Sequence, residues 1–217
     1  MRPHFMKRMG CRMAAKPNFI FSGARGSGKS FGALALARRR SAVLIVDPTS
    51  SVSNQDYTDT DPGRLARVVE RYKTFRACFW CGHLRGSEIA EALKPIIRAA
   101  EEKDTYVTII LDEVGVIFPN RISLEELERS ARMSRHNATS WWFLSQRNVD
   151  ISTNLRAQCE RMFVFATSSA RDVENIRREY GRKAADSLST LSKHQYLAID
   201  TQTRQFAVRD PIKAPGL

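Results

Sequence analysis

Glycines, a lysine and a serine at fixed spacing form the pattern in this sequence that most clearly suggests chemistry. They make up the run Gly23-Ala24-Arg25-Gly26-Ser27-Gly28-Lys29-Ser30, which matches G-x-x-x-x-G-K-S. Glycines at these positions let the backbone curl until its N–H groups point at phosphate oxygens, and a following helix adds the positive end of its dipole. The lysine of this pattern reaches the β- and γ-phosphates, and the serine hydroxyl ligates Mg²⁺. Residues 23–30 are therefore predicted to bind ATP and Mg²⁺, with Lys29 in a catalytic role and Ser30 as a metal ligand.

Two adjacent acids, Asp112 and Glu113, follow the apolar run Val107–Leu111. A P-loop needs a carboxylate at the end of a neighbouring strand, and Asp112 would hold Mg²⁺ there directly or through water. Glu113 would take a proton from the attacking water, which distinguishes a hydrolase from a P-loop kinase. Because the pair comes about 80 residues after the glycine-rich run, it is a Walker B pattern, and we expect ATP hydrolysis.

A third polar group, Ser145-Gln146-Arg147, follows the apolar run Trp141–Leu144. An amide at the tip of a strand beside the Walker B strand can hydrogen-bond the γ-phosphate or its attacking water. We therefore expect Gln146 to act as a γ-phosphate sensor. The alternative is an ordinary solvent-facing glutamine in a loop.

These residues need a scaffold, and the rest of the sequence predicts an α/β fold. Short apolar, β-branched runs alternate with helical stretches, as in a mainly parallel central sheet flanked by helices. The predicted strands are Asn18–Ser22, Ala42–Asp47, Phe75–Trp80, Val107–Asp112, Ser140–Ser145 and Met162–Ala166. The predicted helices are Lys29–Arg40, Leu65–Lys73, Ser87–Glu102, Leu124–His136, Arg171–Tyr180 and Arg182–Ser192.

The remaining segments complete the predicted organisation. A C-terminal β-hairpin has arms at Gln195–Ile199 and Gln205–Arg209, and the polar segment Pro48–Gly63 is predicted to be a surface loop. The length of 217 residues suits one buried domain and is too short for two of ordinary size. We expect a basic N-terminal arm at residues 1–16, a single P-loop ATPase domain at 17–210 and a C-terminal tail at 211–217.

The charge of the chain indicates a partner. Lys and Arg number 35 against 23 Asp and Glu, which gives a formal net charge of +12. A polyanion such as nucleic acid is the natural partner for such a chain. The alternative is that the positive charge serves solubility alone and indicates no particular partner. The N-terminal arm lacks the apolar core of a signal peptide, and no apolar run approaches the ~20 residues that span a bilayer. We expect no membrane span and no secretion.

The cysteines offer one competing site. Cys78-Phe79-Trp80-Cys81 is a C-x-x-C pair with His83 two residues later, whereas Cys11 and Cys159 stand alone. A zinc site requires a second pair at similar spacing. The interpretation we favour is a buried strand that carries small apolar cysteines.

The segment after the Walker B acids resembles one family. It contains the arginine-rich turn Ser134-Arg135-His136, the strand and tip just described, Asp150-Ile151, and then Leu155-Arg156. In this order the features resemble the FtsK–HerA superfamily of DNA-pumping ATPases, and the resemblance covers about Asn18 to Phe165. The small single-domain form with an Arg-His pair resembles the genome-packaging ATPases of tailless icosahedral viruses with an internal membrane. A competitor is the zonula-occludens-toxin-like assembly ATPase of filamentous phages, whose members usually add a membrane-spanning helix.

The resemblance implies partners. Members of the superfamily form homo-oligomeric rings, commonly hexamers, with ATP between neighbours and double-stranded DNA in the channel. An arginine of one subunit then completes the next subunit's site, and Arg135 is the first candidate, followed by Arg147 and Arg156. A packaging role further implies capsid or portal-vertex proteins as partners, and a place in the host cytoplasm or at the packaging vertex of the virion.

Three functional hypotheses remain open at this stage. The leading one is a motor that hydrolyses ATP to translocate double-stranded DNA. The second is an assembly factor whose ATPase remodels coat or membrane proteins without gripping DNA. The third is a P-loop kinase, against which Glu113 and Gln146 argue.

Overall fold

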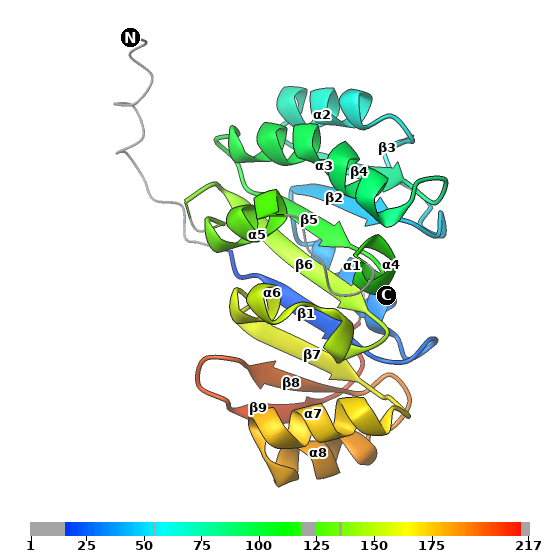
Figure 1. Ribbon diagram of the computed structural model, residues 1–217, viewed down its shortest axis with the longest axis vertical. Coiled ribbons are helices and arrows are strands. Elements are labelled where there is room, and N and C mark those ends of the chain that lie inside the picture. Colours follow the sequence, from blue (N-terminus) through cyan, green and yellow to red (C-terminus); the bar gives the residue numbers. More distant parts are fainter. Residues whose placement is uncertain (1–15, 54, 119–124, 135, 214–217) are drawn as a thin grey trace.

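One twisted sheet organises the molecule (Figure 1). The computed structural model describes residues 16–53, 55–118, 125–134 and 136–213. Within these ranges the strands lie in the order β3-β4-β2-β5-β6-β1-β7-β8-β9. Their bounds are β1 Phe19–Ser22, β2 Ala42–Asp47, β3 Tyr57–Asp59, β4 Phe75–Trp80, β5 Val107–Leu111, β6 Thr139–Ser145, β7 Arg161–Phe165, β8 Tyr196–Asp200 and β9 Phe206–Arg209. Neighbouring strands from β3 through β4, β2, β5, β6 and β1 to β7 pair in parallel. Strand β8 is antiparallel to β7 and to β9, so the expected α/β fold with a C-terminal hairpin is confirmed.

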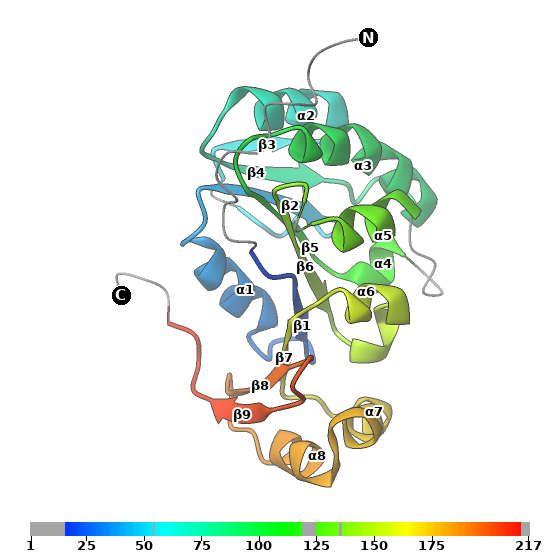
Figure 2. The same cartoon turned by 90° about the vertical axis from the view of Figure 1, so that its left-hand side faces the viewer.

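Helices cover both faces of the sheet, as Figure 2 shows edge-on. Helix α1 and the chain after β9 lie on one face, and the other described helices pack on the opposite side. The bounds are α1 Lys29–Ala37, α2 Pro62–Arg71, α3 Gly86–Glu101, α4 Val114–Ile117, α5 Glu125–Arg132, α6 Thr153–Ala157, α7 Ala170–Tyr180 and α8 Arg182–Ser189, with a 3₁₀ turn η2 at Asn148–Asp150. None of the helices in the described ranges has the length and apolar character needed to cross a bilayer.

The central strands are buried on both sides, which is why they read as continuous apolar runs. All residues of β1, β2, β5 and β6 are buried. Successive side chains point to opposite faces. Ile20 therefore joins the core under α2 to α8, whereas Phe21 joins the smaller core under α1. Because β1 and β5 each pair in parallel with β6, the carboxyl ends of these three strands lie at the same edge of the sheet.

The segment Pro48–Gly63 differs from its prediction as a loop. Its residues Tyr57–Asp59 form β3, which pairs in parallel with β4 at the edge of the sheet. The Asp61 carboxylate then accepts hydrogen bonds from the N–H groups of Gly63 and Arg64, and it caps α2, which begins at Pro62. The loop prediction was wrong here because a three-residue edge strand shows too little alternation to be recognised, and its pairing partner lies later in the chain.

Candidate nucleotide-binding site

The glycine-rich run forms a tight turn between β1 and α1. Gly23, Gly26 and Gly28 have φ angles of +154°, +77° and +102°, a region that L side chains rarely adopt. A Cβ atom at Gly23 would lie 2.7 Å from the Phe165 Cβ. The turn is anchored on its other side by the Ala24 N–H, which donates to the Ala166 carbonyl at 3.0 Å. Glycine is therefore required both by the backbone angles and by the close approach of β7.

The interior of the turn fits a phosphate. The Ser27 hydroxyl oxygen is buried and has no hydrogen-bond partner among the described residues. Gly28, the residue before α1, offers no side-chain cap, and the first turn of the helix contains no acid. The positive end of the helix dipole is thus not neutralised by an acid of α1 itself, and a helix start of this kind favours a phosphate.

The predicted catalytic and metal-binding residues meet at one end of this turn. Lys29 Nζ lies 2.8 Å from Glu113 Oε1, and both side chains are largely buried. Ser30 Oγ lies 3.5 Å from Asp112 Oδ1, at the limit of a hydrogen bond. Two adjacent pairs of residues that lie more than 80 positions apart in the sequence are therefore brought together. Their chemistry fits Mg²⁺, which binds proteins through one or two oxygen ligands and keeps water and substrate phosphates for the rest.

The Asp112 carboxyl lies in a strongly perturbed environment. Burial raises its pKa to about 6, and the neighbouring Glu113 and Asp47 act in the same direction, while Lys29 acts against them. A carboxylate that is costly to ionise without a cation gains when a divalent cation arrives. This arrangement is typical of a metal-binding position and supports Asp112 in that role.

Glu113 has an unusual backbone. Its φ and ψ angles are +52° and +60°, the left-handed region, although it is not glycine. Its N–H donates to Asp112 Oδ1 at 3.1 Å, and α4 begins at the next residue. A left-handed non-glycine residue costs about 1–2 kcal/mol, and residues strained in this way cluster at functional sites. The carboxylate of this strained residue lies beside Lys29.

The tip of β6 lies between these two parts of the site. β6 separates β1 from β5, with Ser145 in register with Ser22 and Phe143 with Leu111. Gln146 and Arg147, which follow Ser145, are exposed. The structure thus places Gln146 next to the start of the P-loop and on the side of Asp112 and Glu113.

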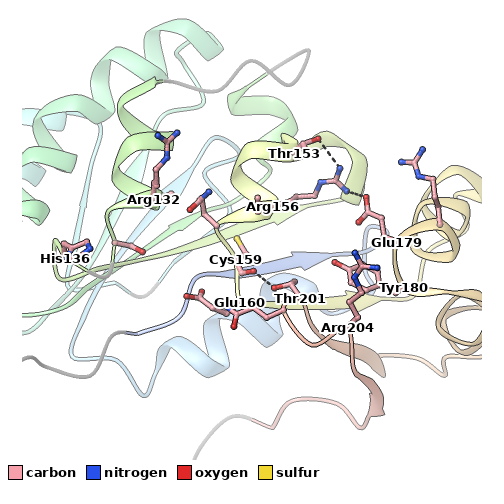
Figure 3. A pocket seen from close by; sticks show the side chains of 16 residues that line it. Arg132, His136, Thr153, Arg156, Cys159, Glu160, Glu179, Tyr180, Thr201 and Arg204 are labelled. Carbon is pink, nitrogen blue, oxygen red and sulfur yellow. Dashed lines mark hydrogen bonds and ion pairs between the residues drawn. The ribbon is translucent and has the colours of Figure 1, made fainter.

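The three candidate arginines have different placements. Arg135 lies outside the described residues. Arg147 shares the tip of β6 with Gln146 and is exposed. Arg156 lies at the opposite, amino-terminal edge of the sheet, where Nη1 donates to Glu179 Oε1 at 2.9 Å and Nη2 to the Thr153 hydroxyl, as Figure 3 shows. Its guanidinium is therefore engaged within its own chain.

Arg156 also lines a cavity of about 750 Å³, which is distinct from the P-loop. The cavity opens where β7 begins and β8 ends, so the length of β1 and β7 separates it from residues 23–30, which follow the carboxyl end of β1. Its charged lining contains Arg132, Arg156, Arg178 and Arg204 with Glu160 and Glu179. The excess of arginines makes it a positively charged hollow (Figure 3).

The cysteine pair lies in the core. Cys78 and Cys81 are buried free thiols, and burial raises the pKa of each to about 12, with Asp47 as the next cause. Metal-binding thiols need the thiolate form. The described residues contain no group of three or more metal-binding side chains.

Two residues near the site, Asp47 and His194, were not among the predicted site residues. Asp47 ends β2 beside β5, and its buried carboxylate accepts hydrogen bonds from the N–H groups of Thr49 and Val52. Its position at the end of an apolar strand is the same signal that marks Asp112. His194, just before β8, places Nδ1 3.2 Å from the Ser27 carbonyl oxygen. Nothing in the local sequence predicts that contact, because it depends on how the hairpin packs on the P-loop.

Comparison with solved structures places this geometry among known folds. The genome packaging NTPase B204 from Sulfolobus turreted icosahedral virus 2, in complex with AMPPCP, matches with a TM-score of 0.74 at 17% identity, over 92% of this chain and 100% of B204. VirB4 of Thermoanaerobacter pseudethanolicus matches with a TM-score of 0.67 at 11% identity, over 91% of this chain and 90% of VirB4. The N-terminal domain of zonular occludens toxin from Neisseria meningitidis matches with a TM-score of 0.50 at 12% identity, over 92% of this chain and 96% of the toxin domain.

Sequence comparison adds nothing to this likeness: no protein-family model matches the chain, and no curated protein does. At these identities the structural likeness concerns the fold. The chain has the fold of these NTPases and ATPases, so the resemblance expected from the three motifs is confirmed at the level of the fold.

Proposed function

We propose that this chain is an ATPase that uses hydrolysis to move double-stranded DNA, as the motor of a viral genome-packaging system. The observation that carries the proposal is the convergence of two pairs at one end of the P-loop. Lys29 lies against Glu113, and Ser30 lies against Asp112. A lysine for the phosphates, a hydroxyl and a carboxylate for a metal, and a second carboxylate for the water are the parts that ATP hydrolysis needs.

Each residue has a definite task in this proposal. The N–H groups of residues 23–30 bind phosphate oxygens, and Lys29 exchanges its contact with Glu113 for the β- and γ-phosphates. Ser30 and Asp112 would hold Mg²⁺, which neutralises charge on the phosphates when it is bound. Glu113, held beside Lys29 by its left-handed backbone, accepts the proton of the attacking water. Gln146 orients that water or contacts the γ-phosphate from the tip of β6.

Two further observations support DNA as the substrate of the proposed motor. The net charge of +12 favours a polyanionic partner. One solved structure that matches 92% of this chain is a genome packaging NTPase, and a second B204 structure is described as that of a DNA-packaging ATPase. We propose a homo-oligomeric ring, a homohexamer, that docks on capsid or portal-vertex proteins in the host cytoplasm.

The test measures ATP turnover and DNA binding together. Duplex DNA should raise the rate of phosphate release, and unrelated duplexes should bind equally well, because phosphate contacts carry no sequence information. The logarithm of the binding constant should fall linearly with the logarithm of salt concentration, by about 0.9 per phosphate contact. ATP turnover that ignores duplex DNA, with no DNA binding at low salt in the presence of an ATP analogue, would contradict the motor function and leave the ATPase intact.

The second candidate function is protein assembly, as in the zonula-occludens-toxin-like ATPases. It is favoured by the likeness to the toxin domain, although the TM-score is lower than for B204. An assembly ATPase should hydrolyse ATP without stimulation by duplex DNA. Negative-stain microscopy with nucleotide adds a separate readout, because the motor function requires closed rings.

A further inference from the structure

A single exposed aromatic ring lies directly beside the P-loop. Phe31 follows Ser30 in the first turn of α1 and is 59% exposed. Among the described residues it is the most exposed of the large apolar side chains, and the others are the aliphatic Val116, Met133 and Val208. One exposed apolar residue on a surface needs no explanation by itself. Its position next to Ser30, the proposed metal ligand, suggests a function for the exposed ring, because nucleobases stack on aromatic faces.

The turn before β8 and the chain after β9 both approach the first part of α1. His194 Nδ1 lies 3.2 Å from the Ser27 carbonyl oxygen, and a Cβ atom at Gly28 would lie 2.9 Å from the same nitrogen. One helical turn later, a Cβ atom at Gly32 would lie 3.0 Å from Ile212 Cδ1. The glycines at 28 and 32 therefore let the turn before β8 and the chain after β9 approach the helix, as Figure 2 shows for the latter.

The His194 ring is held in a defined state. Its residue has a φ angle of +66°, which is strained for a side chain other than glycine. The Ser27 carbonyl can only accept a hydrogen bond, so Nδ1 carries the hydrogen. In the neutral ring Nε2 is then an acceptor. This nitrogen suits a donor such as a ribose hydroxyl or the exocyclic amine of a base.

The strand order indicates on which side of the P-loop each end of a bound nucleotide would lie. Glu113 and Asp112 follow β5, which lies on one side of β1 beyond β6. The γ-phosphate and its metal belong on that side, because Lys29 and Ser30 face these acids. The nucleoside must then extend the other way, toward β7 and β8. His194 lies there, in contact with Ser27, and Phe31 follows Ser27 by four residues, about one helical turn.

We propose that Phe31 and the turn at His194 form a binding subsite for the nucleobase and ribose, with the base stacked on the Phe31 ring. The subsite deepens the proposed ATPase function and rests on it. Stacking accepts any base, because every base has a π-face. The subsite therefore supplies affinity for a nucleoside, while the P-loop supplies affinity for the phosphates.

The experiment separates the two parts of the ligand. Isothermal titration measures the binding of ATP and of inorganic tripolyphosphate, which has the phosphates but no nucleoside, to the wild type and to Phe31→Ala and His194→Ala. We expect Phe31→Ala to bind ATP about 5- to 100-fold more weakly, the range for losing one stacking contact, and to bind tripolyphosphate as the wild type does. His194→Ala should show the same selectivity. Phe31→Tyr should bind both ligands normally, and Val208→Ala, an exposed apolar residue on β9, is the matched control.

Each outcome has a distinct meaning. Selective loss of ATP binding supports the subsite. Equal loss of ATP and tripolyphosphate, or no loss of either, overturns it, because the nucleoside would then contribute nothing at these residues. A wild type that binds neither ligand instead overturns the proposed ATPase function. Circular dichroism checks the fold, which the exposed position of Phe31 should leave intact.

Discussion

The ammonium of Lys29 lies 2.8 Å from the carboxylate of Glu113, so the lysine expected to bind phosphates is paired with the acid expected to activate water. The pair joins the first residue of α1 to the residue that precedes α4. A γ-phosphate competes with Glu113 for the ammonium. Arrival of ATP would therefore release the Glu113 carboxylate at the place where a water molecule has to be deprotonated.

Removing the lysine should stop the reaction at its first step. We expect Lys29→Ala to lose both binding and turnover of ATP, because the phosphates lose their charged partner and Glu113 keeps an uncompensated charge in a largely buried position. Phosphate release and nucleotide titration measure the two effects. Lys73→Ala, an exposed lysine on the connection between α2 and β4, is the control and should behave as the wild type does.

Changing the acid should separate binding from hydrolysis. Glu113→Gln keeps the shape and loses the base, so we expect ATP to bind normally and hydrolysis to fall by roughly 10²–10⁴-fold. Single-turnover measurement of phosphate release checks the rate. Glu91→Gln, the same change on the exposed side of α3, is the control. Wild-type turnover by Glu113→Gln would show that another group deprotonates the water.

Subunit mixing tests the trans-acting arginine expected from the sequence. Arg135→Ala and Glu113→Gln should each be nearly inactive, since loss of such an arginine costs about 10³–10⁵ in rate. In a mixed ring a Glu113→Gln subunit lends its Arg135 to a neighbour that still has Glu113, and part of the activity should return. Mixtures that exchange subunits and stay inactive would rule out Arg135 in trans and point to Arg147.

Arg156 should contribute to stability and not to turnover. Its guanidinium bonds Glu179, and the side chains are 16% and 30% exposed. We expect Arg156→Gln and Glu179→Gln to lower Tm, with a coupling energy of about 0.5–1.5 kcal/mol in a double-mutant cycle. ATP turnover should stay near the wild-type rate. Normal Tm with lost turnover in Arg156→Gln would instead assign this arginine to catalysis.

Asp172 gives the stability a pH dependence. Burial raises the pKa of its carboxyl, and Asp150 adds to the shift, while Ser169, the Val149 N–H and Arg147 oppose it. The folded chain thus holds this proton more tightly than the unfolded chain, whose aspartates titrate near pH 4. The free energy of unfolding should therefore decrease as pH rises from about 4 through the raised pKa.

The Asp172→Asn variant checks this directly. Asparagine cannot ionise, so the Tm of the variant relative to the wild type should increase from pH 5 to pH 8. Asp186→Asn, an exposed aspartate on α8, provides the comparison and should show no such trend. A constant difference in Tm across the pH range would mean that Asp172 titrates as an ordinary aspartate.

The sequence predicts the parallel strands well because each is a buried apolar run between turn residues. β2 matches its predicted bounds, Ala42–Asp47, and β1 and β5 differ by one residue. β3 was missed for a physical reason: Tyr57–Asp59 is half-exposed, and only pairing with β4 makes it a strand. The short helix α4 was missed because it depends on the left-handed turn at Glu113.

The candidate site, like the fold, could be predicted only in part. Lys29, Ser30, Asp112 and Glu113 could be singled out from the sequence, because the functional residues of a P-loop, and those at the end of a strand, are neighbours along the chain. The contact of His194 with Ser27 could not, because 167 positions separate the two and the hairpin alone brings them together. Sequence periodicity carries no information about such a contact.

The 3₁₀ turn η2 joins the site to the outer layer of helices. A Cβ atom at Gly115 in α4 would lie 3.2 Å from Asp150 Oδ2, and η2 also contacts α7. The chain that follows Gln146 therefore runs within a few residues from the site to the contact with α7, which packs on α8. A rearrangement of Gln146 on loss of a phosphate would have a short covalent route to the surface layer of the molecule.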